Sequence, residues 1–170
     1  GFTDPPPGHG AQRYLDQQIT WSDCDKGLQC AAVKAPLDYA APDGQAITVA
    51  LLKRPASEEP RAGTLFVNPG GPGASGVNFA ARFDAKGLER FDIIGWDPRG
   101  TGSSTPVVCA NGKAMDAYTS IDLSPDDAAE EAALEQAQLD FGRGCLDRSG
   151  ALLAHISTAE TAHDLDLLRQ

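Results

Sequence analysis

The stretch that decides the fold is TLFVNPGGPGASG, residues 64–76. It begins with a short apolar run and ends in clustered glycines and prolines. An apolar run bounded by turn residues predicts a strand that is buried on both faces of a sheet. Glycine has no Cβ, so the loop after this strand lets backbone N–H groups approach a ligand closely. The stretch therefore predicts a buried strand that ends in a ligand-binding loop.

Further strands are expected on both sides of this stretch. Downstream, a modest helical stretch over residues 77–83 leads to FDIIGWDPRGTGSS, residues 91–104, which begins with a second buried strand. Strand, crossover and strand form the signature of a parallel βαβ unit. Upstream, residues 30–33 and 47–52 are expected to pair as a hairpin around a turn at 42–44. The fold class is therefore α/β, with antiparallel lead-in strands followed by a parallel sheet.

Two helices are expected in the last third of the chain. Ser124 can cap the first helix, and residues 128–146 supply good helix formers. The second opens at residues 157–160, whose sequence STAE is a capping-box pattern. Residues 1–20 are rich in proline and glycine and predict an exposed leader. Residues 21–170 are then expected to form the body of a domain.

The charge of the chain argues against partners that carry phosphate. A formal net charge of −10 would repel nucleic acids and anionic membranes. No apolar run reaches the roughly eighteen residues that a membrane-spanning helix needs. The acids clustered within residues 126–131 are interpreted as a solvated helix start. We therefore expect neither a nucleic-acid partner nor a membrane-spanning segment.

Four cysteines stand at Cys24, Cys30, Cys109 and Cys145. Zinc sites usually need closely spaced cysteine pairs or histidines at a set spacing, and neither occurs, so no metal site is predicted. Of the three possible pairings, two disulfides that join Cys24 to Cys30 and Cys109 to Cys145 are favoured. Such bonds would imply an oxidising compartment and export from the cell. Four buried free thiols in a cytosolic protein are the alternative.

The glycine loop fits two chemistries, of which the first is dinucleotide binding. Residues 71–76 match the pattern GxGxxG, and Asp97 ends the next strand about twenty residues later. However, Pro69 and Pro72 remove two amide donors near the position of the pyrophosphate. The antiparallel lead-in strands and the expected disulfides also fit this chemistry poorly. A phosphate-binding Walker loop is excluded, because the chain has no Gly-Lys-Ser or Gly-Lys-Thr.

The second chemistry is an oxyanion hole. Acyl transfer builds negative charge on the carbonyl oxygen of the substrate, and a fixed backbone N–H aimed at that oxygen stabilises the transition state. In hydrolases of the α/β-hydrolase fold, one donor lies in the loop after the third strand and the other follows the nucleophile. The glycine loop follows an antiparallel lead-in and one buried strand, as that topology requires.

Two motifs carry a resemblance to a known family. Residues 68–76 and 92–104 resemble the oxyanion loop and the following strand and turn of the prolyl aminopeptidase and tripeptidyl aminopeptidase family of secreted bacterial serine peptidases. Residues 158–169 are similar to the helix that leads into the nucleophile strand of that family, and the cysteines fall where the secreted tripeptidyl branch has them. Pro69 stands where many relatives have histidine, which fits the tripeptidyl branch better. The resemblance spans roughly residues 20–170 and implies the N-terminal portion of an α/β-hydrolase fold.

The resemblance also implies roles for individual residues. Gly71 would offer the N–H that binds the oxyanion. The loop around it would be shaped by Gly70, Pro72 and Gly73. Asp97 and Arg99 are expected to form a salt-bridged turn that holds the end of the strand near the site, rather than to act in the chemistry.

The catalytic triad is not expected within these residues. None of the nine serines stands in a GxSxG elbow, and Ser75, which comes closest, lacks the final glycine. The histidines His9, His155 and His163 are isolated in the sequence. The nucleophile, acid and base are therefore expected in a C-terminal segment beyond Gln170, which would be the partner of this chain. The chain alone is expected to be inactive and the fold incomplete without that segment.

The expected function is that of a secreted serine exopeptidase, which acts through an acyl-enzyme on peptides with a free N-terminus and uses no cofactor. A carboxylesterase or lactone hydrolase of the same fold is the nearest alternative, because the same loop serves any acyl group. An exported non-catalytic binding module and a dinucleotide-dependent oxidoreductase are more remote alternatives.

Overall fold

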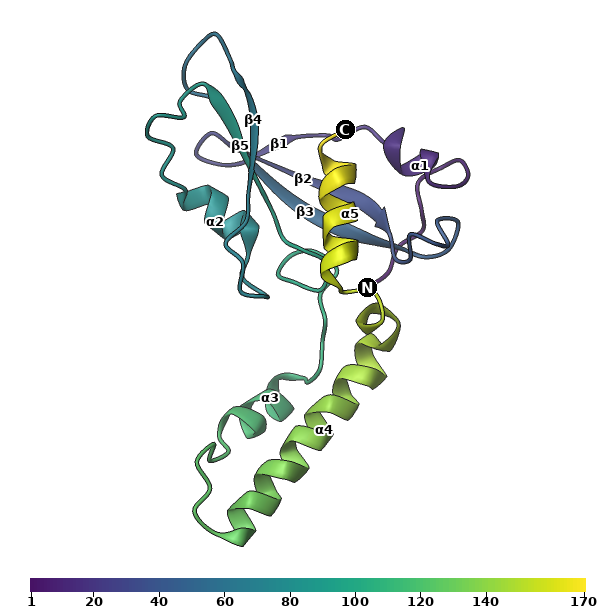
Figure 1. Cartoon of the computed structure of the whole chain (residues 1–170), viewed down its shortest axis with the longest axis vertical. Helices are drawn as coiled ribbons and strands as arrows, with labels where there is room; N and C mark the ends of the chain where they lie inside the picture. The colour runs from purple at the N-terminus through teal and green to yellow at the C-terminus, as the bar shows by residue number, and fades with distance from the viewer. The chain divides into compact units, whose positions relative to one another are not determined.

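The computed structural model describes all residues from Gly1 to Gln170. They form two compact units, of which the first comprises residues 1–106 and 156–170 and the second comprises residues 107–155. The first unit contains the sheet and the glycine loop, and the second is helical (Figure 1).

The first unit is built on a sheet of five strands in the order β1-β2-β3-β5-β4. The strands are β1 (Ser22–Asp25), β2 (Leu28–Pro36), β3 (Ala46–Arg54), β4 (Gly63–Val67) and β5 (Phe91–Trp96). The pairs β1–β2, β2–β3 and β3–β5 are antiparallel, and the pair β5–β4 is parallel. The expected α/β class, with antiparallel strands leading into a parallel pair, is confirmed.

The core lies along β3 and β5, where Ile47, Val49 and Ile93 are almost fully buried. Burial of an aliphatic side chain of this size stabilises the fold by about 1.5–3 kcal/mol. Helix α2 (Gly76–Arg82) connects β4 to β5 and packs closely on β5. A Cβ on Gly95 would come within 2.6 Å of the Cβ of Ala80, so this close packing requires glycine.

Strand β4 is less buried than the sequence predicts. All but one of its residues are of intermediate exposure, and Thr64 is exposed. The reason is its place in the sheet: β4 is an edge strand that pairs only with β5. One row of its backbone N–H and C=O groups therefore has no partner strand.

Residues 1–20 are largely exposed and are anchored to the sheet. Thr3 forms an antiparallel bridge with Ala46. Helix α1 (Gln12–Leu15) contains the buried Tyr14, whose hydroxyl donates to the carbonyl oxygen of Pro42 at 3.1 Å. The segment is therefore packed against the sheet through a few specific contacts.

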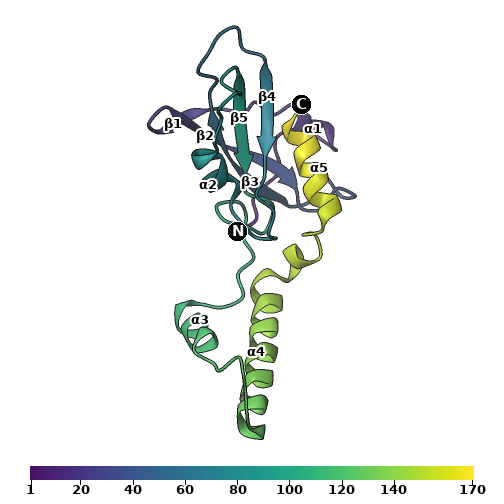
Figure 2. The same cartoon turned by 60° about the vertical axis from the view of Figure 1, so that its left-hand side comes forward.

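Helix α5 (Thr158–Leu168) completes the first unit and begins with the capping box expected at Ser157 and Glu160. Gly95 contacts α2, whereas its neighbour Trp96 and Leu165 of α5 line one groove. Successive side chains of a strand point to opposite faces, so α2 and α5 cover opposite faces of the sheet (Figures 1 and 2).

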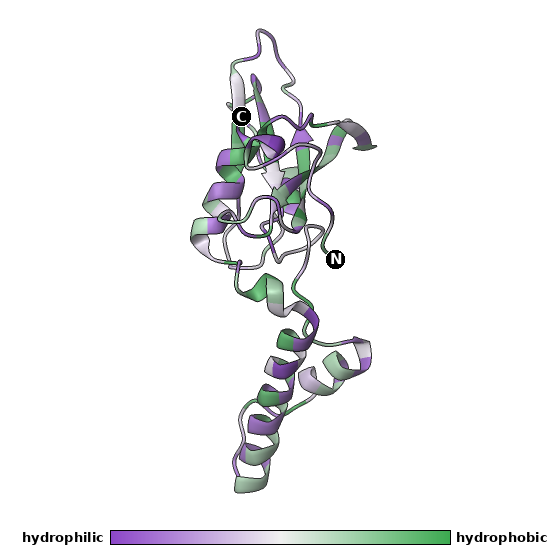
Figure 3. Ribbon diagram, turned by 90° about the vertical axis from the view of Figure 1, so that its right-hand side faces the viewer, coloured by the Kyte–Doolittle hydropathy of each residue, from purple (hydrophilic) through white to green (hydrophobic).

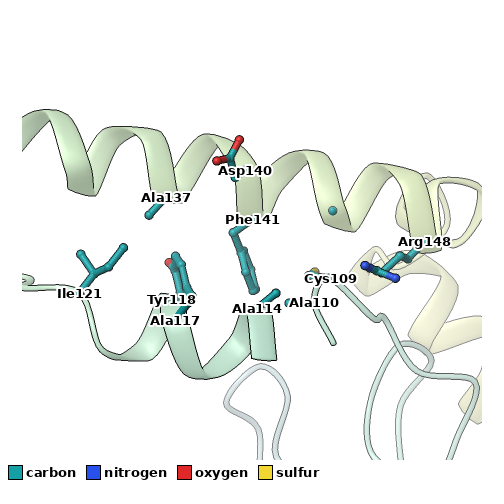
Figure 4. Close-up of a pocket in the computed structure, with 11 residues that line it drawn as sticks. Cys109, Ala110, Ala114, Ala117, Tyr118, Ile121, Ala137, Asp140, Phe141 and Arg148 are labelled. Carbon is teal, nitrogen blue, oxygen red and sulfur yellow. The ribbon is translucent and has the colours of Figure 1, made fainter. Parts of the chain in front are cut away.

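The second unit is a pair of helices, α3 (Gly112–Thr119) and α4 (Ala128–Leu153). Tyr118 of α3 stacks on Phe141 of α4 with the ring centroids 4.4 Å apart, and both rings line a pocket together with several alanines of the two helices (Figure 4). The expected cap at Ser124 is wrong. Asp127 caps α4 instead, because its carboxylate accepts from the N–H groups of Ala129 and Glu130 at 2.8 and 2.9 Å.

Both disulfides are the ones favoured from the sequence, and no cysteine is free. Cys24–Cys30 joins β1 to β2, and Cys109–Cys145 ties the start of the second unit to α4. Hydrophilic and hydrophobic residues alternate along α4 (Figure 3), and none of the helices has the length and apolarity to cross a membrane.

Candidate functional site

The glycine loop lies between the end of β4 and the start of α2. Gly70, Gly71 and Gly73 have φ angles of +79°, +129° and +99°. These values lie in the region that residues with a Cβ rarely adopt. The side-chain oxygen of Asn68 accepts the N–H of Gly70 at 2.7 Å and turns the chain away from the strand. The loop conformation therefore depends on glycine at these three positions.

Gly71 is the most constrained residue of the loop. A Cβ at this position would lie 3.0 Å from the N atom of Gly73 and 3.1 Å from that of Ala74. Its own N–H donates to no group of the chain. The amide that was expected to act as the oxyanion donor is thus held in a shaped loop and is not consumed by an internal hydrogen bond.

A groove of about 500 Å³ lies beside the loop. Gly70 to Gly73 form one wall, and Thr158, Thr161 and Leu165 of α5 form another. Trp96 and Pro98, at the end of β5, also line the groove. The loop and the carboxyl end of β5 therefore border one cavity, as expected for a site at the carboxyl ends of parallel strands.

Trp96, which lines the groove, carries an unsatisfied hydrogen-bond donor. Trp96 is only 4% exposed, and its indole Nε1–H is buried without an acceptor. Its ring packs edge-on against Phe66 of β4, with the centroids 6.0 Å apart. A buried donor without a partner costs about 1–3 kcal/mol. The fold therefore leaves one buried donor beside the groove without an acceptor.

Asp97 holds the end of the glycine loop. Its side chain is buried, and its carboxylate accepts from Ser75 Oγ at 2.6 Å, from the N–H of Val77 at 3.1 Å and from the N–H of Ser103 at 2.8 Å. The carboxylate therefore connects the loop, the first turn of α2 and the turn after β5.

Arg99 is paired with Asp164 of α5. Its guanidinium binds both carboxylate oxygens of Asp164 in α5, each at 2.7 Å, and also the carbonyl oxygens of Pro36 and Leu37. The reason is that α5 covers this face of the sheet and buries an acid there. Arg99 thus joins the turn after β5 to α5 and to the end of β2.

Tyr39 completes this buried cluster. Its hydroxyl donates to Asp164 at 2.7 Å, and its ring packs against His163. Burial raises the pKa of Tyr39, and the charge of Asp164 raises it further. Burial lowers the pKa of Arg99, but the hydrogen bonds and the charge of Asp164 outweigh it, so that pKa is raised overall. Both side chains therefore stay protonated in the fold.

Asp164 was not identified from the sequence, although a signal is present. It precedes Leu168 by four residues and so lies on the same helix face, which is the buried one. An acid on the buried face of an amphipathic helix indicates a buried cation as its partner.

Other candidate groups are already engaged as helix caps. Ser75 donates to Asp97 and accepts from the N–H of Asn78, which makes it the cap of α2. The carboxylates of Asp126, Asp127 and Glu130 lie within 4.8 Å of one another, the arrangement that a metal ion would need. However, Asp127 caps α4 and Glu130 accepts from the N–H of Asp126, so their hydrogen bonds account for this cluster as a helix start.

Comparison with known proteins finds no matching family model. The chain is 36% identical over 173 residues to a tripeptidyl aminopeptidase of Streptomyces coelicolor, which covers 94% of this chain and 32% of that protein. It is 37% identical over 177 residues to carboxylesterase B of Mycobacterium tuberculosis, covering 95% of this chain and 34% of the relative. It is 34% identical over 177 residues to the serine protease Hip1 of the same species, covering 94% and 33%.

The chain thus spans about a third of the length of the curated relatives that it matches. The names of these relatives agree with the family that residues 68–76 and 92–104 resemble. Over nearly its whole length, the chain is therefore homologous to part of a group of bacterial serine hydrolases that includes tripeptidyl aminopeptidases.

Proposed function

We propose that this chain is part of a secreted serine exopeptidase and that it supplies one of the two oxyanion donors, the N–H of Gly71. The observation that carries the proposal is the glycine loop after β4, in which this amide has no internal partner and the loop borders a groove. The relatives named tripeptidyl aminopeptidase and serine protease support the reaction class.

The proposed role is electrostatic. When a nucleophile attacks an acyl carbon, the carbonyl oxygen gains negative charge, and a fixed N–H aimed at that oxygen stabilises it without reorganisation. Loss of one such donor typically lowers kcat by about 10²–10³-fold, or about 2.7–4 kcal/mol. The three glycines with positive φ allow the loop to take this conformation, in which the amide of Gly71 has no internal partner.

The nucleophile, acid and base come from outside these residues in this proposal. The free edge of β4 supports it, because a further parallel strand pairing there would bring its carboxyl end to the edge of the sheet that bears the glycine loop. A nucleophile elbow sits at such a strand-to-helix turn, and the amide after the nucleophile supplies the second donor.

The substrate of the complete enzyme is proposed to be a peptide with a free N-terminus. The tripeptidyl aminopeptidases of two Streptomyces species support a peptide. A carboxylesterase is the second candidate, since the mycobacterial relative carries that name and the oxyanion loop serves either acyl group. The two disulfides support secretion, because such bonds persist in oxidising compartments.

The test of the class is a fluorophosphonate probe applied to the complete protein. A serine hydrolase becomes covalently labelled, and labelling is lost after heat denaturation. Absence of labelling in folded protein would overturn the proposal.

The substrate class is tested with matched compounds. Mono-, di- and tripeptidyl anilides are compared with their N-acetylated forms and with the corresponding esters. We expect the free-amine anilides to have the higher kcat/KM. Equal cleavage of acetylated and free peptides contradicts an exopeptidase, and hydrolysis of esters alone favours the carboxylesterase.

A further inference from the structure

Side-chain hydrogen bonds hold the glycine loop at both ends. At its start, Asn68 accepts from the N–H of Gly70 at 2.7 Å. At its end, Ser75 donates its hydroxyl hydrogen to Asp97 at 2.6 Å and accepts from the N–H of Asn78 at 3.0 Å. Between these anchors the chain passes through Gly71 and Gly73, both with positive φ. The position of the Gly71 amide therefore depends on how firmly the two ends are held.

Asp97 is itself rigidly placed. The side chain is 1% exposed, and three donors surround its carboxylate: the Ser75 hydroxyl, the Val77 amide and the Ser103 amide. Its backbone carbonyl also accepts from Ser104 Oγ at 2.5 Å. A Cβ on Gly102 would come within 2.8 Å of the carboxyl carbon of Asp97, so the turn after β5 packs directly on this group.

We propose that Asp97 is a positioning residue, which acts through Ser75 to hold the Gly71 amide at the place where the oxyanion forms. The inference rests on the proposed function. Asp97 touches no reacting atom in this scheme. It fixes the loop to the carboxyl end of β5, the most buried strand of the sheet, and so transfers the rigidity of the core to a loop that is rich in glycine.

This role predicts an effect on turnover rather than on substrate affinity. An amide displaced by about 1 Å stabilises the oxyanion poorly, and misplacement of that size can lower the rate about 10²-fold. Ground-state binding depends far less on this amide, because the charge on the oxygen develops only in the transition state. A residue that is merely structural would instead lower the amount of folded enzyme and leave the kcat of the folded fraction unchanged.

The experiment uses Ser75→Ala, Ser75→Thr and Asp97→Asn in the complete protein, with kcat and KM measured on a free-amine peptidyl anilide. Active sites are counted by fluorophosphonate labelling. Ser75→Ala is expected to lower kcat about tenfold to a hundredfold with KM changed less than about threefold. Ser75→Thr keeps the hydroxyl and restores kcat. Asp97→Asn turns an NH₂ group either toward the donors Ser75 and Val77 or toward the N–H of Ser103, and is also expected to lower kcat.

Asn111→Ala is the matched control, since Asn111 caps α3 in the second unit by accepting from the N–H of Ala114 at 3.0 Å. It removes the same kind of helix cap without touching the loop, and its kcat should equal that of the wild type. Hydrogen exchange of residues 69–76 provides a second readout, which should accelerate in Ser75→Ala and not in Ser75→Thr.

The outcomes separate the two proposals. In one outcome the wild type is active, Ser75→Ala has the same kcat as Asn111→Ala, and its loop exchanges hydrogen no faster than that of the wild type. The positioning role is then overturned and the proposed function stands. If the folded wild type neither binds the probe nor cleaves peptides, both fall together.

Discussion

Arg99 and Asp164 form the most deeply buried ion pair of the chain, with side chains 0% and 1% exposed. The pair connects residues that are 65 positions apart, and two backbone carbonyl groups of the β2 end share the guanidinium. A buried pair of this kind is weak evidence for net stabilisation, but removal of one partner leaves the other charge buried without this counter-ion.

Asp164→Ala is therefore expected to destabilise the protein by about 3–5 kcal/mol. The matched control is Asp166→Ala in the same helix, which breaks an exposed pair with Arg169 and should cost at most about 1 kcal/mol. Urea denaturation of the complete protein measures both. Similar midpoints for the two variants would show that the buried pair does not hold α5 on the sheet.

The tyrosine beside this pair makes stability depend on pH. Burial raises the pKa of Tyr39 above its ordinary value of about 10, and Asp164 raises it further. At a pH between the ordinary pKa and the raised pKa, Tyr39 keeps its proton in the folded protein and releases it in the unfolded chain. The contribution of protonated Tyr39 to the free energy of unfolding is therefore complete below about pH 10 and is lost as the pH rises above that value.

Tyr39→Phe is expected to flatten this alkaline loss, because phenylalanine has no proton to release. At neutral pH the variant should be less stable by about 1 kcal/mol, since a hydrogen bond to Asp164 is lost. Melting temperatures recorded at several pH values on both sides of pH 10 measure the effect. If the curves of the wild type and the variant run parallel through the alkaline range, Tyr39 does not cause the loss.

At the scale of elements, two of the three glycines of helix α4, Gly142 and Gly144, have opposite surroundings. Gly142 has open space where a Cβ would be, whereas a Cβ on Gly144 would overlap the carbonyl oxygen of Cys109. The disulfide between Cys109 and Cys145 holds the chain at that point. The close approach of this segment to α4 therefore requires glycine at one position and merely tolerates it at the other.

Gly142→Ala is expected to stabilise the second unit by about 0.5–1 kcal/mol, because alanine has the higher helix propensity. Gly144→Ala should instead destabilise it by about 1–3 kcal/mol through overpacking. Thermal unfolding followed by circular dichroism distinguishes the two. A stabilising Gly144→Ala would mean that the segment around Cys109 does not pack on α4 as described.

At the scale of the whole molecule, β4 is an edge strand with no neighbour on one side, and an open groove lies beside α5. The edge strand has unpaired backbone groups, and Trp96 has an unpartnered indole N–H. Exposed edges and grooves of this kind favour association with other chains.

Residues 1–170 expressed alone are therefore expected to aggregate or to bind a hydrophobic dye, and to show no peptidase activity. The complete protein should do neither and should be active. Size-exclusion chromatography with dye fluorescence provides the comparison. A monodisperse monomer that unfolds cooperatively from residues 1–170 alone would contradict the need for a further segment.

Several local features could be predicted from the sequence because they depend on neighbouring residues. The strand at Phe91–Trp96 and the capping box at Ser157 lie where the pattern indicated. The glycine loop, too, was identified from a short run of residue types. The first cap was misplaced at Ser124, because Asp127 is an equally good cap residue three positions later and the local pattern does not choose between them.

By itself the sequence determined the α/β class, the disulfide pairing that was favoured, and the relation to serine hydrolases, all of which follow from local patterns and motifs. Only the tertiary structure decided that β4 lies at the edge of the sheet, that Arg99 binds Asp164 and that Asp97 holds Ser75. The physical reason is that these contacts form only when distant segments meet. Their partners are selected by the burial of charge and by the order of the strands, neither of which is encoded in residue spacing.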